Sequence, residues 1–164
     1  MITAVFATGR RGEFGNKNGT LPWGSIPEEL ELFFDTVSRL NPSALIVGAH
    51  TWLTLPNSAK ERLVTENSIT WVYILDPSGE AKPIVNAKPR AYSYHCVFIT
   101  TVTPTLASMF KDINAVAIGG AYLLDKLYSN NLVDRALVSV IKPAAGEPDF
   151  KAEVTLPSTV YLAF

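Results

Sequence analysis

Short, continuously apolar runs alternate with stretches of helical character along this chain. When successive residues are all apolar, both sides of a strand are buried, as in a parallel sheet that is covered by helices. The sequence therefore predicts an α/β fold in three layers, with a mostly parallel central sheet and helices on both of its faces. The predicted strands are 2–8, 44–47, 69–75, 94–100, 115–118 and 135–142.

The clearest predicted helix follows the segment Ser25-Ile26-Pro27-Glu28, which has the spacing of a capping box with proline in the first turn. Leu30, Phe33, Phe34 and Val37 then recur at i, i+3, i+4 and i+7, which predicts one buried apolar stripe. Other predicted elements are helices at 50–55, 105–111 and 121–129, a loop at 9–19, a turn at 76–79 and a short pair of edge strands at 154–156 and 159–164.

Length and composition favour one domain over residues 1–164, since 48% of the residues are hydrophobic and 18% are charged. The net charge of −1 gives no electrostatic footprint for nucleic acid. The single cysteine, Cys96, excludes an internal disulfide and a CxxC zinc site, and we expect no metal. No apolar run reaches the roughly 20 residues of a membrane span, and residues 1–6 lack the basic start of a signal peptide. We therefore expect a cytoplasmic monomer that binds neither nucleic acid nor membrane.

The carboxyl ends of the predicted strands mark the expected ligand site, because open parallel sheets bind ligands there. Ala7, Thr8, Asp76 and the segments 48–51 and 119–122 should border one cleft. Both glycine-marked segments open a helix after a strand, where backbone N–H groups and the helix dipole favour phosphate. Two such helix starts would suit a dinucleotide. A glycine pair equally serves any tight strand-to-helix turn, and the GxGxxG fingerprint is missing.

Glu29 is the acidic residue of the first predicted helix that lies nearest the apolar stripe, one turn from Phe33. A carboxyl group that is half-buried beside aromatic rings binds a proton more readily than an exposed one, which suits proton handling near neutral pH. The alternative interpretation is an ordinary acid at a helix start, where the helix dipole favours negative charge.

Several short segments, taken together and in order, resemble the dihydrofolate reductases, over residues 1–56 and 102–142. The combination of Leu-Pro-Trp, Pro-x-x-acid and Gly-Gly is specific for that family, whereas any one piece is not. The resemblance implies the family's fold and its reaction, in which hydride passes from NADPH to C6 of 7,8-dihydrofolate and N5 is protonated, giving tetrahydrofolate. The matching segments are Gly15 with Leu21-Pro22-Trp23, Pro27-Glu28-Glu29-Leu30 through Phe33, Val47-Gly48-Ala49-His50-Thr51-Trp52, Ala117-Ile118-Gly119-Gly120-Ala121 and Val133-Asp134-Arg135.

The resemblance also implies roles for single residues. Glu29 matches the family's acid, which hydrogen-bonds the pterin and supports protonation; Ser139 matches the residue that holds this acid, and Trp23 the tryptophan that orders a nearby water. The implied substrate contacts are Ala7, Leu30, Phe33, Phe34, Leu55 and Ile118. The implied cofactor contacts are Ala7, Gly15, Leu21, Gly48, Ala49, His50, Thr51, Gly119, Gly120, Ala121, Tyr122 and Leu123, with a cis bond between the two adjacent glycines.

Several positions depart from the family pattern, Tyr122 and Leu124 beside the second phosphate site among them. Ala49 stands where many members have an arginine for the 2′-phosphate of NADPH, and Asp76 would repel a phosphate but could hold a ribose diol, so NADH is not excluded. Phe34 replaces a polar or basic residue at the folate tail. Arg62 is the nearest candidate for the arginine that grips the folate α-carboxylate.

Two other functions stay open at this point. A pterin or pyrimidine reductase on the same fold would keep the acid and the glycines but act on a different substrate tail. A non-catalytic descendant would keep the fold as a ligand-binding protein.

Overall fold

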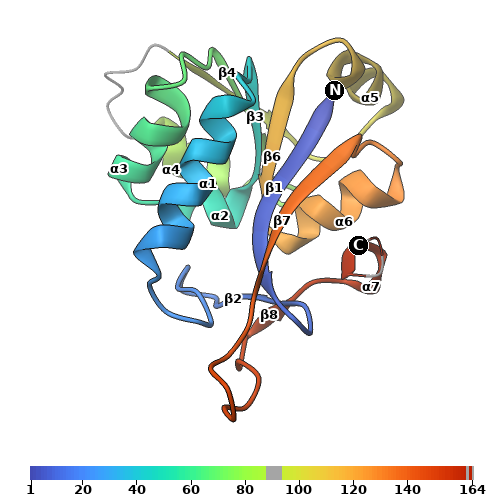
Figure 1. The fold of residues 1–164 in the computed structure, drawn as a ribbon. Coiled ribbons are helices and arrows are strands. Elements are labelled where there is room, and N and C mark those ends of the chain that lie inside the picture. The colour runs from blue at the N-terminus through green and yellow to red at the C-terminus, as the bar shows by residue number, and fades with distance from the viewer. Residues whose placement is uncertain (88–93, 162, 164) are drawn as a thin grey trace.

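The computed structural model describes residues 1–87, 94–161 and 163 and contains a six-stranded sheet in which every neighbouring pair of strands is parallel (Figure 1). The predicted α/β fold with a parallel sheet is therefore confirmed. The strands of this sheet are β1 (Ile2–Gly9), β3 (Ala44–Gly48), β4 (Trp71–Leu75), β5 (His95–Ile99), β6 (Ala115–Gly119) and β7 (Arg135–Ile141).

The strand order is β5-β4-β3-β6-β1-β7, so β1 lies between β6 and β7, and β7 is an edge strand. Figure 1 shows helices on both faces of the sheet, which gives the three layers expected from the sequence. On one face lie α1 (Pro27–Arg39), α2 (Ala49–Thr54), α3 (Asn57–Lys60) and α4 (Ala81–Asn86); on the other lie α5 (Pro104–Lys111) and α6 (Ala121–Ser129).

Side chains of the central strands point alternately to the two faces of the sheet, which explains why both faces are buried. Leu45 and Val47 of β3 belong to the apolar cluster that includes Trp52 of α2. Their neighbours Ala44 and Ile46 point to the opposite side and belong to the cluster under α5 and α6. Since side chains alternate along a strand, a continuous apolar run supplies both clusters at once.

The start of α1 differs from the predicted capping box. Ile26, not Ser25, is the N-cap residue, and no side chain caps the helix. Pro27 has the fixed φ of a first helical residue, so the helix begins directly at it. Phe34 and Val37 are buried as predicted, but Leu30 is 49% exposed, so the buried stripe begins later than the sequence pattern indicated.

Three further elements were not predicted from the sequence. A short helix α3 continues into the π-helical turn η1 (Glu61–Thr65), and α4 contains a proline. None of them is long enough to show a clear apolar period, which is the signal on which sequence-based assignment depends. The predicted loop at 9–19 also contains a short strand, β2 (Glu13–Gly15).

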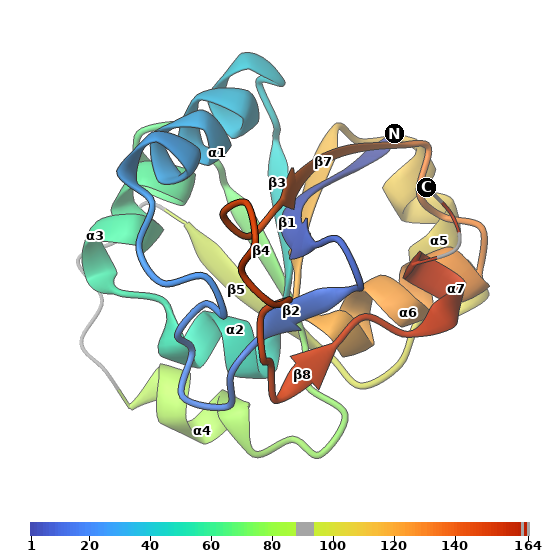
Figure 2. The same cartoon turned by 60° about the horizontal axis from the view of Figure 1, so that its bottom comes forward.

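The C-terminal part of the chain differs most from the prediction. Val154–Thr155 form β8, but this strand pairs antiparallel with β2 in a separate two-stranded sheet. The predicted partner strand at 159–164 is wrong over its first residues, since Ser158–Tyr161 form the helix α7; positions 162 and 164 lie outside the described residues. Figure 2 shows β2 and β8 across the end of the main sheet, between α2 and α6.

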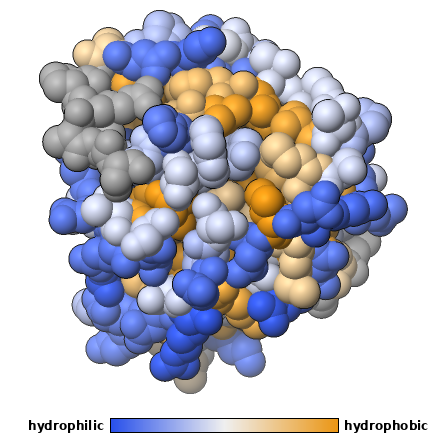
Figure 3. Space-filling view, turned by 90° about the horizontal axis from the view of Figure 1, so that it is seen from above, coloured by the Kyte–Doolittle hydropathy of each residue, from blue (hydrophilic) through white to orange (hydrophobic). Residues whose placement is uncertain are grey.

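Figure 3 views the opposite end of the molecule, where the strands begin, and shows apolar patches between hydrophilic side chains. Among the described residues, no helix has the length and apolarity that crossing a membrane requires. The same part of the chain contains no cluster of three or more His, Cys, Asp or Glu residues suited to a metal ion.

Candidate active site

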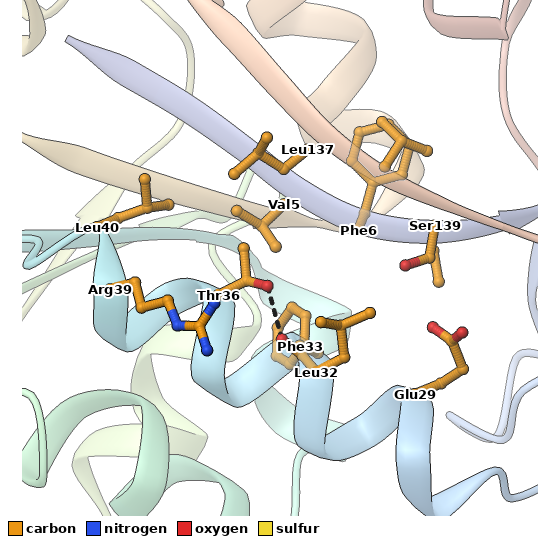
Figure 4. A pocket seen from close by; sticks show the side chains of 12 residues that line it. Val5, Phe6, Glu29, Leu32, Phe33, Thr36, Arg39, Leu40, Leu137 and Ser139 are labelled. Carbon is orange, nitrogen blue, oxygen red and sulfur yellow. Dashed lines mark hydrogen bonds between the residues drawn. The ribbon is translucent and has the colours of Figure 1, made fainter.

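A pocket of about 410 Å³ lies between α1 and the strands β1 and β7 (Figure 4). This volume is within the range of small-molecule sites, and most of the lining is apolar. Four residues predicted for the site line it together: Ala7, Glu29, Phe33 and Ser139. The residues that complete the lining are Val5, Phe6, Leu32, Thr36, Arg39, Leu40, Leu137 and Val138.

Register brings two of the predicted residues next to each other. Ala7 of β1 is the direct partner of Ser139 of β7 in the parallel pair, so both side chains point to the α1 face of the sheet. The half-buried carboxylate of Glu29 projects from α1 toward the same place, and Figure 4 shows it facing the Ser139 hydroxyl. The pocket thus has a polar end made of a carboxylate and a hydroxyl group.

Sequence analysis did not find the part of the pocket that extends along α1. Thr36 and Arg39 follow Glu29 at i+7 and i+10, close to two and three helical turns, and therefore lie on its face of the helix. The apolar stripe of the sequence indicated the neighbouring face of α1 instead. Counting helical turns onward from Glu29 would have found these residues.

Four other predicted substrate residues do not line this pocket. Phe34 and Ile118 are buried in the cluster between α1, α2 and the sheet, and Leu55 packs against that cluster. Leu30 is largely exposed. These four residues lie outside the pocket that contains Glu29.

A second feature is a tight glycine cradle where β3 and β6 end side by side. Val47 pairs with Gly119 in the register of these strands. A Cβ atom added to Gly48 would lie 2.9 Å from the backbone nitrogen of Gly120, and one added to Gly120 would lie 3.0 Å from Oγ1 of Thr51. The peptide bond between Gly119 and Gly120 is cis, as the resemblance implies. Gly48 has no room for a side chain and Gly120 has little, so the starts of α2 and α6 are open to a closely approaching ligand.

Phe14 of β2 is a residue of this region that sequence analysis missed. Its Cζ atom would be 2.9 Å from a Cβ added to Gly119, so its ring lies directly on the glycine. The ring also makes an edge contact with Phe6, with centroids 6.1 Å apart. Phe14 was missed because β2 is too short to show a regular spacing of apolar residues.

The remaining predicted cofactor residues surround the cradle with different exposures. Ala49 and Ala121 begin α2 and α6 and are half-buried, and Leu123 is buried in the core behind α6. His50 and Tyr122 are exposed on the same two helices. Leu21 is exposed and Gly15 is half-buried, both in the segment that includes β2.

The Asp76 side chain stabilises the start of α4. Its side chain is buried, and its carboxylate oxygens accept hydrogen bonds from the backbone nitrogens of Ala81 and Lys82, the shortest to each being 3.1 Å. The carboxylate therefore caps the first turn of α4. This geometry does not support the predicted ribose contact of Asp76, and we do not include the residue in the proposed cofactor site.

Trp23 lies outside the pocket lining and packs against the C-terminal segment. Its ring makes an edge contact with Phe150, with centroids 6.0 Å apart. Arg10 and Arg11 both pair with Asp149 next to that phenylalanine. The segment before β8 is thus tied to the loops on either side of β2.

Arg62, the candidate for gripping a substrate carboxylate, is occupied by a carboxylate of this chain. Its guanidinium donates to the two oxygens of Glu31 at 2.6 and 2.9 Å and lies over the ring of Phe34, 4.1 Å from the centroid. The hydrogen bonds from Arg62 lower the pKa of Glu31 below its ordinary value. The Glu31 side chain is exposed to solvent and that of Arg62 is partly exposed.

The fold and the site define an α/β protein that has a small-molecule pocket and a candidate nucleotide cradle. No family model matches the chain. The chain is 34% identical over 162 residues to the dihydrofolate reductase of Escherichia phage T5, an alignment that covers 98% of this chain and 82% of that relative. The chain therefore belongs to the dihydrofolate reductase family.

Proposed function

We propose that this chain is a dihydrofolate reductase, which transfers hydride from NADPH to C6 of 7,8-dihydrofolate while N5 gains a proton, giving tetrahydrofolate. The observation that carries the proposal is the Glu29 carboxylate in an otherwise largely apolar pocket, in a chain of this family. A carboxylate on a helix can accept two N–H groups from the edge of an aminopyrimidine ring, which fixes the orientation of a pterin.

The polar end of the pocket has two groups with separate tasks. Glu29 accepts the amino and ring N–H groups of the pterin and supports protonation of the substrate. Ser139, which faces it, can donate its hydroxyl hydrogen and hold the carboxylate in place. Phe33 and Ala7 supply apolar walls that exclude water from the ring.

The glycine cradle supports a nucleotide as the second ligand. The absence of side chains at Gly48 and Gly120 lets a phosphate approach the backbone at the starts of α2 and α6. Thr51, whose hydroxyl lies against Gly120, adds a donor at the same place. When bound, NADPH supplies the hydride. We propose that one cofactor phosphate binds at Gly48 to Thr51 and the other at Gly119 to Leu123.

The choice between NADPH and NADH depends on few residues. Ala49 offers no charge to a 2′-phosphate, and Asp76 is turned into the fold. The exposed imidazole of His50 in the first turn of α2 is the group that we propose for this phosphate.

The direct test is purified protein with NADPH and dihydrofolate, followed by the loss of the NADPH absorbance. Tetrahydrofolate formation at one equivalent per NADPH consumed supports the proposal, and stable ligand binding without turnover would identify a non-catalytic binding protein instead. Replacing NADPH with NADH in a parallel assay measures the cofactor preference.

A second candidate function is a reductase for a pterin that has no glutamate tail. The pairing of Arg62 with Glu31 favours it, because this arginine is not free to receive a substrate carboxylate. A higher kcat/KM for an untailed dihydropterin than for dihydrofolate would support this alternative.

A further inference from the structure

The strand β7 forms one edge of the main sheet. All seven of its residues pair with β1 on one side, and no strand of the described part of the chain lies on its other side. None of the backbone hydrogen bonds in the described loops and turns reaches β7 either. An edge of this kind presents backbone N–H and C=O groups to which a further strand can bind.

The sequence of β7 lacks the features that normally protect an edge strand. Natural edges are protected by charged side chains, by proline or by bulges. Residues 136–141 contain no charge, no proline and no glycine. Two of their large apolar side chains, Leu137 and Val140, are 41% and 46% exposed and point to opposite faces of the sheet. A strand of this composition is suited to pairing with another strand.

Few registers allow β7 to pair antiparallel with β7 of a second copy. In an antiparallel pair, two residues that lie opposite each other either both direct their backbone groups toward the partner strand or both away from it, and these directions alternate. A two-fold axis must therefore pass through a residue. With the axis at Val138, all seven residues of β7 are paired, since Arg135 lies opposite the partner's Ile141. Moving the axis by one residue leaves residues at the end of β7 without a partner in the other β7.

The charges that flank β7 complement each other in this register. Asp134, directly before β7, lies opposite the partner's Lys142, directly after it, and the symmetry creates this pair twice. Both side chains are exposed. Oδ2 of Asp134 accepts a hydrogen bond from the backbone nitrogen of Ile2 at 2.6 Å, which leaves Oδ1 for the ammonium group. Opposite charges that face each other across two strands stabilise the pairing.

We propose that two copies of this chain form a dimer through antiparallel pairing of their β7 strands, with the two-fold axis at Val138. The pairing joins the two six-stranded sheets into one continuous sheet. Because the same edge is used by both copies, the assembly closes at two. This dimer differs from the monomer that we expect from the sequence.

The dimer places a side chain of the second copy next to the pocket. Ser139 lies opposite the partner's Leu137, and residues that lie opposite each other in a sheet point to the same face. Ser139 and Leu137 both line the pocket of their own chain. Each copy therefore adds an apolar side chain beside the polar end of the other pocket, and the exposed surface of Leu137 is removed from water.

The experiment measures the molar mass of the purified chain by light scattering during gel filtration, and the Kd of the dimer by analytical ultracentrifugation. Val140→Lys places a charge on the edge, and Lys142→Glu places two carboxylates opposite each other. Lys82→Glu is the matched control, because it makes the same charge change at an exposed position of α4, which Figure 2 shows on the opposite side of the molecule from β7. Thermal unfolding verifies the fold of each variant.

We expect the unmodified chain to have the mass of two copies and the Val140→Lys variant that of one. Lys142→Glu should raise the Kd of the dimer about tenfold, because both symmetry-related pairs become repulsive at once. Lys82→Glu should change this Kd by less than about twofold.

A disulfide tests the register. In the double variant Ala136→Cys with Val140→Cys, each new thiol lies opposite a new thiol of the second copy. Oxidised glutathione should convert these two pairs of thiols into two disulfides between the copies and is itself reduced. Ala136→Cys alone is the control and should give no such link, because residue 136 then faces the partner's valine.

The proposal is overturned if the unmodified chain has the mass of one copy at about 100 μM, a concentration at which even a weak specific dimer forms. It is also overturned if Lys142→Glu leaves the Kd of the dimer unchanged, since the copies would then meet through another surface. This variant decides the question if Val140→Lys does not fold. Failure of the double variant to form the link, or assembly beyond two copies, would refute the two-fold pairing of β7.

Discussion

Arg62 and Glu31 form a two-pronged ion pair across the gap between η1 and α1, with N···O distances of 2.6 and 2.9 Å. The hydrogen bonds from the guanidinium lower the pKa of Glu31 from its ordinary value of 4.5. A carboxyl group with a lowered pKa in the folded state contributes stability above its unfolded pKa and loses that contribution as the pH falls through its folded pKa. The stabilisation from this pair should therefore decrease as the pH falls.

Glu31→Gln should lower the melting temperature slightly at neutral pH, because the pair is exposed and solvent screens it. The difference from the unmodified protein should shrink as the pH is lowered below about 4.5, where the carboxyl of the unfolded chain is already protonated. Calorimetric melting curves over a pH series measure this difference. A difference that grows on acidification would contradict the assigned pairing.

Glu29→Gln should reduce turnover at neutral pH by about 10² to 10⁴, the usual contribution of a positioned acid or base. The fold should persist, because the side chain is half-buried at a pocket wall and no cation among the described residues forms an ion pair with it. Steady-state kinetics measure the effect. Glu28→Gln is the matched control, since this exposed neighbour in the same first turn lies outside the pocket. Equal rates for the two variants would remove Glu29 from the mechanism.

Gly48→Ala should weaken NADPH binding about tenfold or more and destabilise the fold by about 1 to 3 kcal/mol. The added methyl group would meet the backbone nitrogen of Gly120 at 2.9 Å, which can move only if β3 and β6 separate. Gly120→Ala should be milder, because its methyl group would meet the Thr51 side chain at 3.0 Å. Fluorescence titration measures the affinity for NADPH, and urea unfolding measures the stability of each variant. A larger effect of Gly120→Ala than of Gly48→Ala would contradict the close contact between Gly48 and the backbone of Gly120.

Asp76→Ala should cost about 0.5 to 2 kcal/mol of stability, because it removes the carboxylate oxygens that accept from the first backbone N–H groups of α4. The ratio of kcat/KM values for NADPH and NADH should stay the same. Urea unfolding gives the stability, and parallel assays with the two cofactors give the ratio. A clear shift toward NADPH would mean that this carboxylate faces the nucleotide after all.

Asp149→Ala should expose the loop before β2 to trypsin, because both Arg10 and Arg11 lose their common partner. Mass spectrometry of timed digests should show faster cleavage after these two residues. Glu147→Ala, an exposed change in the same segment, should leave the cleavage rate unaltered. Equal rates in both variants would show that other contacts, such as the one between Trp23 and Phe150, hold the segment.

The sequence predicted correctly those elements in which apolar residues recur at a regular spacing or form a continuous run. The six strands of the sheet and α6 are found where they were predicted, within a few residues. The start of α1 was misplaced by one residue, because Ser25 matched a capping motif that Pro27 makes unnecessary. In α4, a proline and the lack of an apolar period concealed a helix whose cap comes from Asp76.

The candidate site could be predicted in part. Glu29 was found from its place beside an apolar stripe, and it lies in the pocket. Arg39 was missed because the apolar stripe indicated the neighbouring face of α1, although Arg39 lies on the same face of the helix as Glu29. The pairing of β8 with β2 joins residues that are far apart in sequence, which no local pattern can indicate.

The position of β1 between β6 and β7 has a consequence for synthesis on the ribosome. The strand β1 supplies Ala7 and Val5, yet both of its neighbours, β6 and β7, are synthesised after β3, β4 and β5. A nascent chain must therefore hold this apolar segment without its partners until β6 and β7 have been synthesised. Folding that depends on such distant pairings is slow, so we expect chaperones to engage the growing chain early.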